Sequence, residues 1–399
     1  MAMAAPQITP FPSGDAPKLF SLDDDEPPLR WQRAVHLAPQ SGPGVGRRAV
    51  FFALLGWVPI AVWALARGRF VHAAPGEPLL QHYGVHTRCL VVIPLLILGE
   101  ATFQNAAQRY LPQFITSGLV DDSTRPRFDA ALRAFRRWRD ASLPWLVMLA
   151  AAIGWTVVAQ APAGQDEMSW AIDNTGAVGF GGVWFAHVVR PIFLTLLLAW
   201  LWRFGLLAMF FVRIHKLNLS LVPSHPDRAG GLGFLEKLLA AFAPVSLALS
   251  TTLASRWAHE IVYHQQTLNA FKMPAATFVV TWSLILFAPF LALVPLLFAA
   301  KRAALPLYAA MVAEQGRLVR RRWIEGSPQA DGPLIEPEGV GVIADAATMY
   351  SQVQAMRVLP FTKEAFIAVL LPLVVPMLVV AALQVPIKTM LAGLVKTLL

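Results

Sequence analysis

The chain contains a single cysteine, Cys89, among its 399 residues, so no disulfide can form within it. Charged residues are also scarce: Asp, Glu, Lys and Arg make up 14% of the chain, compared with about a quarter of a soluble protein. Hydrophobic residues, in contrast, make up 56%. The beginning of the chain lacks the basic start and apolar core of a signal peptide. This composition argues against an ordinary soluble domain and indicates an integral membrane protein.

The hydrophobic residues are concentrated in seven stretches, each close to the length of about 20 residues that a helix needs to cross a bilayer. Their lengths predict an all-α protein, a polytopic membrane helical bundle of about seven transmembrane helices between residues 49 and 385. The second stretch is the least apolar. The expected spans are 49–66, 88–106, 143–159, 183–202, 238–254, 275–300 and 365–385.

The basic residues fall mainly on one side of these spans. Of the 33 Lys and Arg residues, 25 lie in segments 1–48, 101–142, 203–237 and 301–364, and the intervening segment 160–182 has none. Because cytoplasmic loops are enriched in Lys and Arg, this alternation predicts a multi-pass protein of the cell inner (plasma) membrane, with a cytoplasmic amino terminus and an external carboxyl terminus. The net charge of +9 therefore needs no nucleic-acid partner, and we expect none.

The segments outside the spans predict little soluble structure. Residues 1–48 are rich in proline and contain an acidic run, which is typical of a disordered cytoplasmic tail. Cytoplasmic helical insertions are expected at about 107–142 and 301–364. Residues 386–399 have one apolar and one polar face, which predicts an interfacial helix. The largest segment has 64 residues, fewer than the 100 or so of a typical catalytic domain.

The segment 124–140 is expected to form a basic amphipathic helix. Its apolar residues recur every three or four positions, and arginines occupy much of the remainder. One interpretation is contact with anionic lipid headgroups at the cytoplasmic face. The other is a helix that packs on its own cytoplasmic neighbours. The bilayer is thus the one partner that the sequence indicates, and protein partners stay unknown.

The most specific local pattern is the cytoplasmic sequence HPDRAGGLGFL at 225–235, directly before the fifth span. Glycines permit positive φ, and the amides at the start of a helix are free to bind an anion. The candidate binding residues are His225, Asp227, Arg228, Gly230, Gly231 and Gly233. Their spacing matches neither a dinucleotide fingerprint nor a phosphate loop, so no cofactor is expected. The alternative is a tight re-entry loop in which Asp227 or His225 accepts hydrogen bonds from backbone amides.

Together with flanking residues, this pattern resembles a signature of uncharacterised bacterial multi-pass inner-membrane proteins. The similarity runs from about Trp57 to the end of the chain, and it implies location and architecture without an activity. The residues that carry it, beside the motif, are Arg213, Leu217, Leu219, Leu221-Val222-Pro223, Tyr350, Val353, Met356-Arg357, Leu359-Pro360-Phe361 and Leu370-Leu371-Pro372.

Ionisable and hydroxyl side chains within the spans are the other candidates, because a charge at membrane depth is costly unless it is paired or hydrated. Glu100 and Arg203 lie at similar inner depth, which predicts an ion pair between the second and fourth spans. Arg190 is expected near the outer face, in a polar vestibule or at the membrane interface. Ser246 and Ser250 in the fifth span either line a permeation path or tie helices together.

The sequence predicts no catalytic residues and no metal site. His259 and Glu260 precede His264 in a pattern that invites comparison with zinc peptidases, but histidines five residues apart lie about 140° apart around a helix. These observations favour a role in solute transport or a channel-like function. A membrane scaffold or sensor is the alternative, and a membrane-embedded enzyme ranks third.

Overall fold

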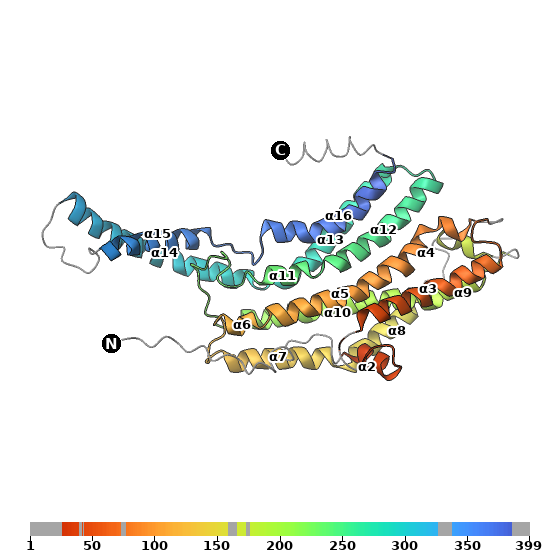
Figure 1. The fold of residues 1–399 in the computed structure, drawn as a ribbon, viewed down its shortest axis with the longest axis horizontal. Helices are drawn as coiled ribbons and strands as arrows, with labels where there is room; N and C mark the ends of the chain where they lie inside the picture. Colours follow the sequence, from red (N-terminus) through yellow and green to blue (C-terminus); the bar gives the residue numbers. More distant parts are fainter. Residues whose placement is uncertain are drawn as a thin grey trace.

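The computed structural model describes residues 26–39, 42, 44–72, 77–158, 166–172, 176–325 and 337–384. This part of the chain is helical, and its only extended pairing is an isolated β-bridge between Ile172 and Val178. The expectation of an all-α membrane bundle is confirmed. The helices run roughly along the long axis of an elongated molecule (Figure 1).

Seven helical segments of the described chain are long and apolar enough to cross a membrane. They are α3 (Val45–Ala66), Tyr83–Thr116, Phe180–His215, Leu235–Tyr263, α13 (Leu268–Leu291), α14 (Val294–Val319) and α16 (Lys363–Ala381). A shorter apolar helix, α8 (Ser142–Val158), lies beside α10. The chain is therefore an integral membrane protein by length and composition of its helices.

Three of these seven segments are built from more than one α-helix. Tyr83–Thr116 contains α4 (Tyr83–Thr87), α5 (Ile93–Tyr110) and α6 (Gln113–Thr116); Phe180–His215 contains α9 (Phe180–Trp184) and α10 (Arg190–His215); Leu235–Tyr263 contains α11 (Leu235–Ala240) and α12 (Ala243–Tyr263). Outside the seven segments and α8, the described chain also has α2 (Pro27–Ala34), α7 (Arg125–Arg139) and α15 (Pro337–Ala355). Single π-helical turns join α4 to α5 at Arg88–Val92 and α9 to α10 at Phe185–Val189. Each join is followed within two residues by a proline, which cannot donate the backbone hydrogen bond of a regular helix.

The expected sixth span, 275–300, is not one helix. Helix α13 ends at Leu291 and α14 begins at Val294, with Pro295 in the first turn of α14. Because proline has no amide hydrogen and its ring clashes with the preceding turn, a continuous helix is interrupted here. Helix α14 then pairs with α15, and this pair extends away from the remaining helices, toward the left in Figure 1.

The amino-terminal expectation also needs correction. Within the segment 1–48, expected to be disordered, residues 27–34 form α2, and α3 already begins at Val45. Pro27 stands at the first helical position of α2, where a missing amide hydrogen costs nothing. Residues 1–25 and the predicted interfacial helix at 386–399 lie outside the described residues.

The amphipathic helix predicted at 124–140 is α7, and its apolar face packs on protein. Phe128 and Phe135 are buried, and their rings lie 6.1 and 5.8 Å from the ring of Phe210 on α10. Of the two interpretations of this helix, packing on its own neighbours accounts for the apolar face. Arg133 and Arg137 remain exposed on the opposite face.

Two large apolar cores hold the described part of the bundle together, and a small cluster around Trp257 of α12 and Val380 of α16 adds to them. The larger unites residues of α5, α10, α11, α12, α13 and α16, with α7 at its edge. The smaller joins α3 to the α4 region and to α9. Helices α3, α5 and α10 thus meet along one side, and a charged cluster lies where α2 and α8 cover that meeting point.

Candidate functional site

The predicted pair of Glu100 and Arg203 is present. The Nη1 and Nη2 atoms of Arg203 each donate to Oε1 of Glu100 at 3.1 Å, and both side chains are 5% exposed. The guanidinium also lies over the ring of Trp200, with 5.1 Å between Cζ and the ring centroid. Trp200 is fixed in turn because its indole nitrogen donates to the Leu96 carbonyl at 3.1 Å. Gly99 permits this close approach, since a Cβ there would stand 3.0 Å from the Trp200 ring.

Two further charged side chains complete the cluster. Arg48 on α3 lies 2.7 Å from Oε2 of Glu100. Glu26, at the start of α2, accepts from Arg203 Nε at 3.3 Å and from Nη2 at 2.6 Å. Two carboxylates and two guanidiniums are therefore buried together, which is the condition under which charges are tolerated inside a protein. Burial raises the pKa of the Glu26 carboxyl, and the attraction of Arg203 opposes that shift.

Sequence reasoning missed Glu26 and Arg48 for identifiable reasons. Arg48 was counted among the residues that set topology, and Glu26 belonged to an acidic tail. A signal was available for Glu26, because an acidic residue followed by Pro27-Pro28 is typical of a helix start. Nothing local in the sequence indicates that this helix folds back onto Arg203.

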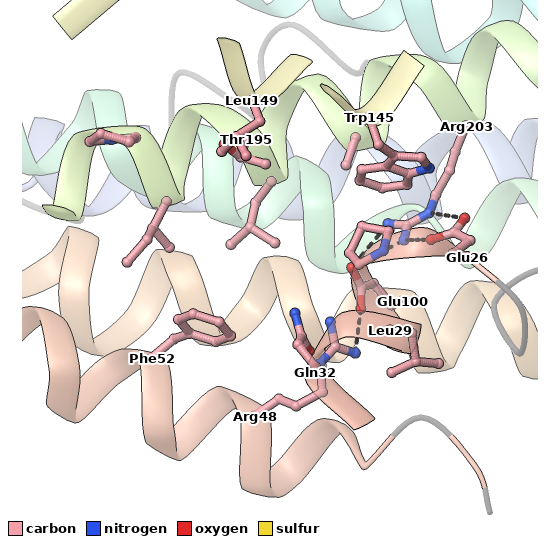
Figure 2. Close-up of a pocket in the computed structure, with 15 residues that line it drawn as sticks. Glu26, Leu29, Gln32, Arg48, Phe52, Glu100, Trp145, Leu149, Thr195 and Arg203 are labelled. Carbon is pink, nitrogen blue, oxygen red and sulfur yellow. Dashed lines mark hydrogen bonds and ion pairs between the residues drawn. The ribbon is translucent and has the colours of Figure 1, made fainter. Parts of the chain in front are cut away.

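A cavity of about 200 Å³ opens from this cluster, as Figure 2 shows. Its walls are mainly apolar and include Phe52 of α3 and Leu149 of α8, whereas the four charged side chains line one end. The complete lining is Glu26, Pro28, Leu29, Gln32, Arg48, Phe52, Glu100, Trp145, Leu149, Pro191, Ile192, Thr195, Leu196, Ala199 and Arg203.

Three polar atoms of lining residues are buried without a hydrogen-bond partner among the described residues. They are Oε1 of Gln32, Nε1 of Trp145 and Oγ1 of Thr195. Buried polar atoms are nearly always satisfied in folded proteins, so water or a bound solute in this cavity can supply the missing partners. The cavity thus combines apolar walls, one charged end and unsatisfied polar groups, the usual composition of a small-molecule site.

The remaining intramembrane candidates lie elsewhere. Oγ of Ser250 donates to the Leu373 carbonyl, and Oγ of Ser246 accepts from the Trp282 indole at 3.1 Å. Both serines are fully buried and tie α12 to α16 and α13, which matches the helix-tie interpretation. Arg190 stacks over the ring of Phe185 at 5.5 Å and does not line the cavity.

The motif at 225–235 forms a compact turn organised by one carboxylate. Oδ1 of Asp227 accepts from the amides of Ala229 at 2.8 Å and Gly231 at 3.2 Å, and Oδ2 accepts from Gly233 at 2.8 Å. Burial would raise the pKa of Asp227, but these backbone hydrogen bonds lower it below its ordinary value. An external anion at these amides must displace the Asp227 carboxylate.

Arg357 anchors this turn from the far end of the chain. It donates to the Asp227 carbonyl at 2.8 Å, and its backbone amide donates to the Arg228 carbonyl at 2.7 Å. Gly230 and Gly231 have φ values of +65° and +95°, which explains why glycine occupies both positions. His225, beside the turn, is exposed and lies 2.9 Å from Oδ1 of Asp227.

Comparison with known proteins adds no assignment: no family model, no curated protein and no solved structure matches the chain. The function therefore has to be argued from the geometry of the site.

Proposed function

We propose that the chain is a solute-handling membrane protein, transporter-like or channel-like, whose cavity binds a small amphipathic anion at Arg203. One observation carries this proposal: the Glu26 carboxylate occupies Arg203 through two contacts at the charged end of an otherwise apolar cavity. A carboxylate is the group that a planar guanidinium binds best in this bidentate fashion.

Glu26 acts as an internal substitute for the anion. It belongs to a short helix that precedes the first span, so it can leave Arg203 without breaking a transmembrane helix. Glu100 stays in place because α5 holds it between Arg48 and Arg203. An incoming anion that replaces Glu26 keeps the cluster neutral in the same way, and its apolar part fills the space beside Phe52 and Leu149.

The size of the cavity limits the solute. An engineered apolar cavity of about 150 Å³ binds benzene, and this cavity is about 200 Å³. A single short alkyl chain or one aromatic ring fits, whereas a two-chain phospholipid does not. We therefore choose 1-octanesulfonate as the probe, because it is permanently anionic, and 1-octanol as its neutral match.

Binding of octanesulfonate to purified protein should quench or shift the fluorescence of Trp145, which lines the cavity. The variant Glu26→Gln is expected to bind about tenfold more tightly, about 1.4 kcal/mol, because the internal competitor is weakened. Arg203→Lys should lose most of the affinity, since lysine cannot form the bidentate contact. Glu314→Gln, an exposed carboxylate on α14, is the matched control and should bind as the wild type does.

Two results would contradict this proposal. One is equal affinity for octanol and octanesulfonate, which would show that the cavity binds alkyl chains without recognising an anion. The other is unchanged affinity in both Glu26→Gln and Arg203→Lys. Uptake of octanesulfonate into proteoliposomes then separates transport from sensing, because a sensor binds the anion without moving it.

We also propose the orientation that the basic residues indicate. In this arrangement α8 crosses the membrane as the third span, and α14 does not cross it. Helix α14 carries Lys301, whose Nζ donates to the carbonyls of Gln354 and Met356 at 2.9 and 2.6 Å and holds the α14–α15 pair together. This pairing outside the bundle supports the cytoplasmic position that the basic residues of 301–364 indicate. Helix α8 has 17 residues, close to the lower limit for a span.

Cysteine labelling tests this orientation directly. A cysteine at Ala177 should react with an impermeant maleimide in intact cells, and one at Ala313 should react only after permeabilisation, because both positions are exposed and predicted on opposite sides. The native Cys89 is fully buried and serves as the unreactive background. Labelling of both positions from one side would show the orientation to be wrong.

A further inference from the structure

A second group of polar side chains lies away from the cavity, where α12 ends and α4 begins, at the right-hand end of the molecule in Figure 1. Nε2 of His82 lies 3.1 Å from Oε2 of Glu77, and Nε2 of His259 lies 3.2 Å from the same oxygen. The two imidazoles stack at 4.6 Å between ring centroids. The donor atoms of the three residues all lie within 4.8 Å of one another.

The proton of the His259 imidazole is directed away from Glu77. Nδ1 of His259 lies 2.9 Å from the Gln81 carbonyl, which only accepts, so in the neutral ring Nδ1 carries the proton and Nε2 presents a lone pair. Nε2 of His82 lies 3.0 Å from the Ser169 hydroxyl, and its single lone pair serves either that hydroxyl or a bound cation. With the His82 proton on Nδ1 and the hydroxyl turned away, two imidazoles and one carboxylate offer electron pairs from atoms within 4.8 Å of one another.

Two of these atoms lack a hydrogen-bond partner within the described part of the chain. They are Oε2 of Glu77 and Nε2 of His259, both buried, and His259 as a whole is 7% exposed. Acceptors that face one another in a buried position repel unless a proton or a metal ion lies between them, and two imidazoles around one carboxylate oxygen form the donor set of a metal ion. The protein also fixes the ring of His259 through the Gln81 carbonyl, which is the outer contact that metal-binding histidines usually make.

The spacing fits a tetrahedral ion. Bonds of about 2.0–2.1 Å at the tetrahedral angle place neighbouring donor atoms about 3.3 Å apart. The Nε2–Oε2 distances of 3.1 and 3.2 Å in the structure are close to that value. Two imidazole nitrogens and one carboxylate oxygen favour zinc over calcium or magnesium, which prefer oxygen donors alone.

We infer that Glu77, His82 and His259 form a zinc site that clasps the end of α12 to the segment preceding α5. His264 lies beside the group, with its Nε2 3.5 Å from Oε1 of Glu77, and is a candidate for the fourth ligand. His264 reaches this position because α12 ends at Tyr263, so the angle between residues five apart on a helix does not apply. Histidines five residues apart diverge only on a continuous helix, and Glu77 and His82 come from a distant part of the chain.

Metal analysis of the full-length protein in detergent tests the inference. Protein incubated with Zn²⁺ and dialysed against metal-free buffer is expected to retain about one zinc per chain. The variants Glu77→Gln and His82→Gln/His259→Gln should lose the zinc. Their affinity for zinc should fall by more than about 100-fold, because loss of a ligand costs more than loss of a residue that only hydrogen-bonds a ligand, which costs about ten- to hundredfold. His187→Gln, an exposed histidine outside the cluster, is the matched control and should retain the metal.

Cobalt substitution supplies a readout that does not require any variant to fold. Co²⁺ added to the wild-type protein should give the intense visible absorption of a tetrahedral centre, and one equivalent of Zn²⁺ should abolish it. Absence of this spectrum in the wild type overturns the inference. Retention of stoichiometric zinc by well-folded His82→Gln/His259→Gln protein also overturns it, because the metal would then be held by other surface groups.

Discussion

Replacing Glu100 with glutamine is expected to lower the free energy of unfolding by about 3–5 kcal/mol, the cost of breaking a buried ion pair by removing one partner. The change removes the carboxylate that contacts both Arg48 and Arg203, which are 4% and 5% exposed, and leaves only the contact of Glu26 with Arg203. Equilibrium unfolding in mixed micelles measures this loss. Glu314→Gln, on the exposed surface of α14, should change the stability by no more than about 0.5 kcal/mol.

The geometry also predicts which second change restores stability. Arg48 contacts Oε2 of Glu100, whereas Arg203 has Glu26 as a second carboxylate. Glu100→Gln with Arg48→Gln therefore leaves a matched Arg203–Glu26 pair and should recover part of the loss. Glu100→Gln with Arg203→Gln leaves Arg48 and Glu26 without their main partners and should recover less. Strictly additive losses in both double variants would show that the four residues do not act as one cluster.

The second large effect is expected at the turn before α11. Asp227→Ala removes the acceptor of three backbone amides and should lower the free energy of unfolding by about 2–4 kcal/mol. The reason is that the folded state then pays the desolvation penalty of these amides without a hydrogen bond in return. Asp227→Asn keeps the shape and one oxygen, so about half of that loss is expected. If both variants unfold as the wild type does, the turn does not depend on this carboxylate.

The pH dependence of this contribution follows from the lowered pKa of Asp227. The folded state holds the carboxylate more strongly than the unfolded state, so the stabilisation is complete above the unfolded pKa of about 3.9. It is lost as the pH falls through the folded value. The difference in stability between wild type and Asp227→Asn should therefore be constant near neutral pH and shrink in acid. A difference that grows in acid would contradict this assignment.

The sequence predicted those features of the structure that depend on neighbouring residues or on the cost of placing a group in the membrane. Apolar length predicted the helical class, and the cost of intramembrane charge predicted that Glu100 meets Arg203. Three- and four-residue spacing located α7 closely. The interpretation of the 225–235 segment as a turn with Asp227 bound to backbone amides was one of two stated, and the hydrogen bonds match it.

What the sequence did not predict depends on contacts between distant segments. Glu26 meets Arg203 across 177 residues, and His259 meets Glu77 across a similar span of chain. The spacing of residues along the chain does not indicate contacts between segments so far apart. The division of the expected sixth span has a local cause instead, since Pro295 interrupts the continuous helix that apolar length alone predicts.

The docking of α2 fixes an order of events during synthesis. Glu26 leaves the ribosome early, but its partner Arg203 follows 177 residues later. At a synthesis rate of about 5–20 residues per second, Glu26 waits about 9–35 s before the cluster can close. Helix α2 therefore reaches its place only after α10 has been made, and a bulky fusion just ahead of it would impair assembly without touching any transmembrane helix.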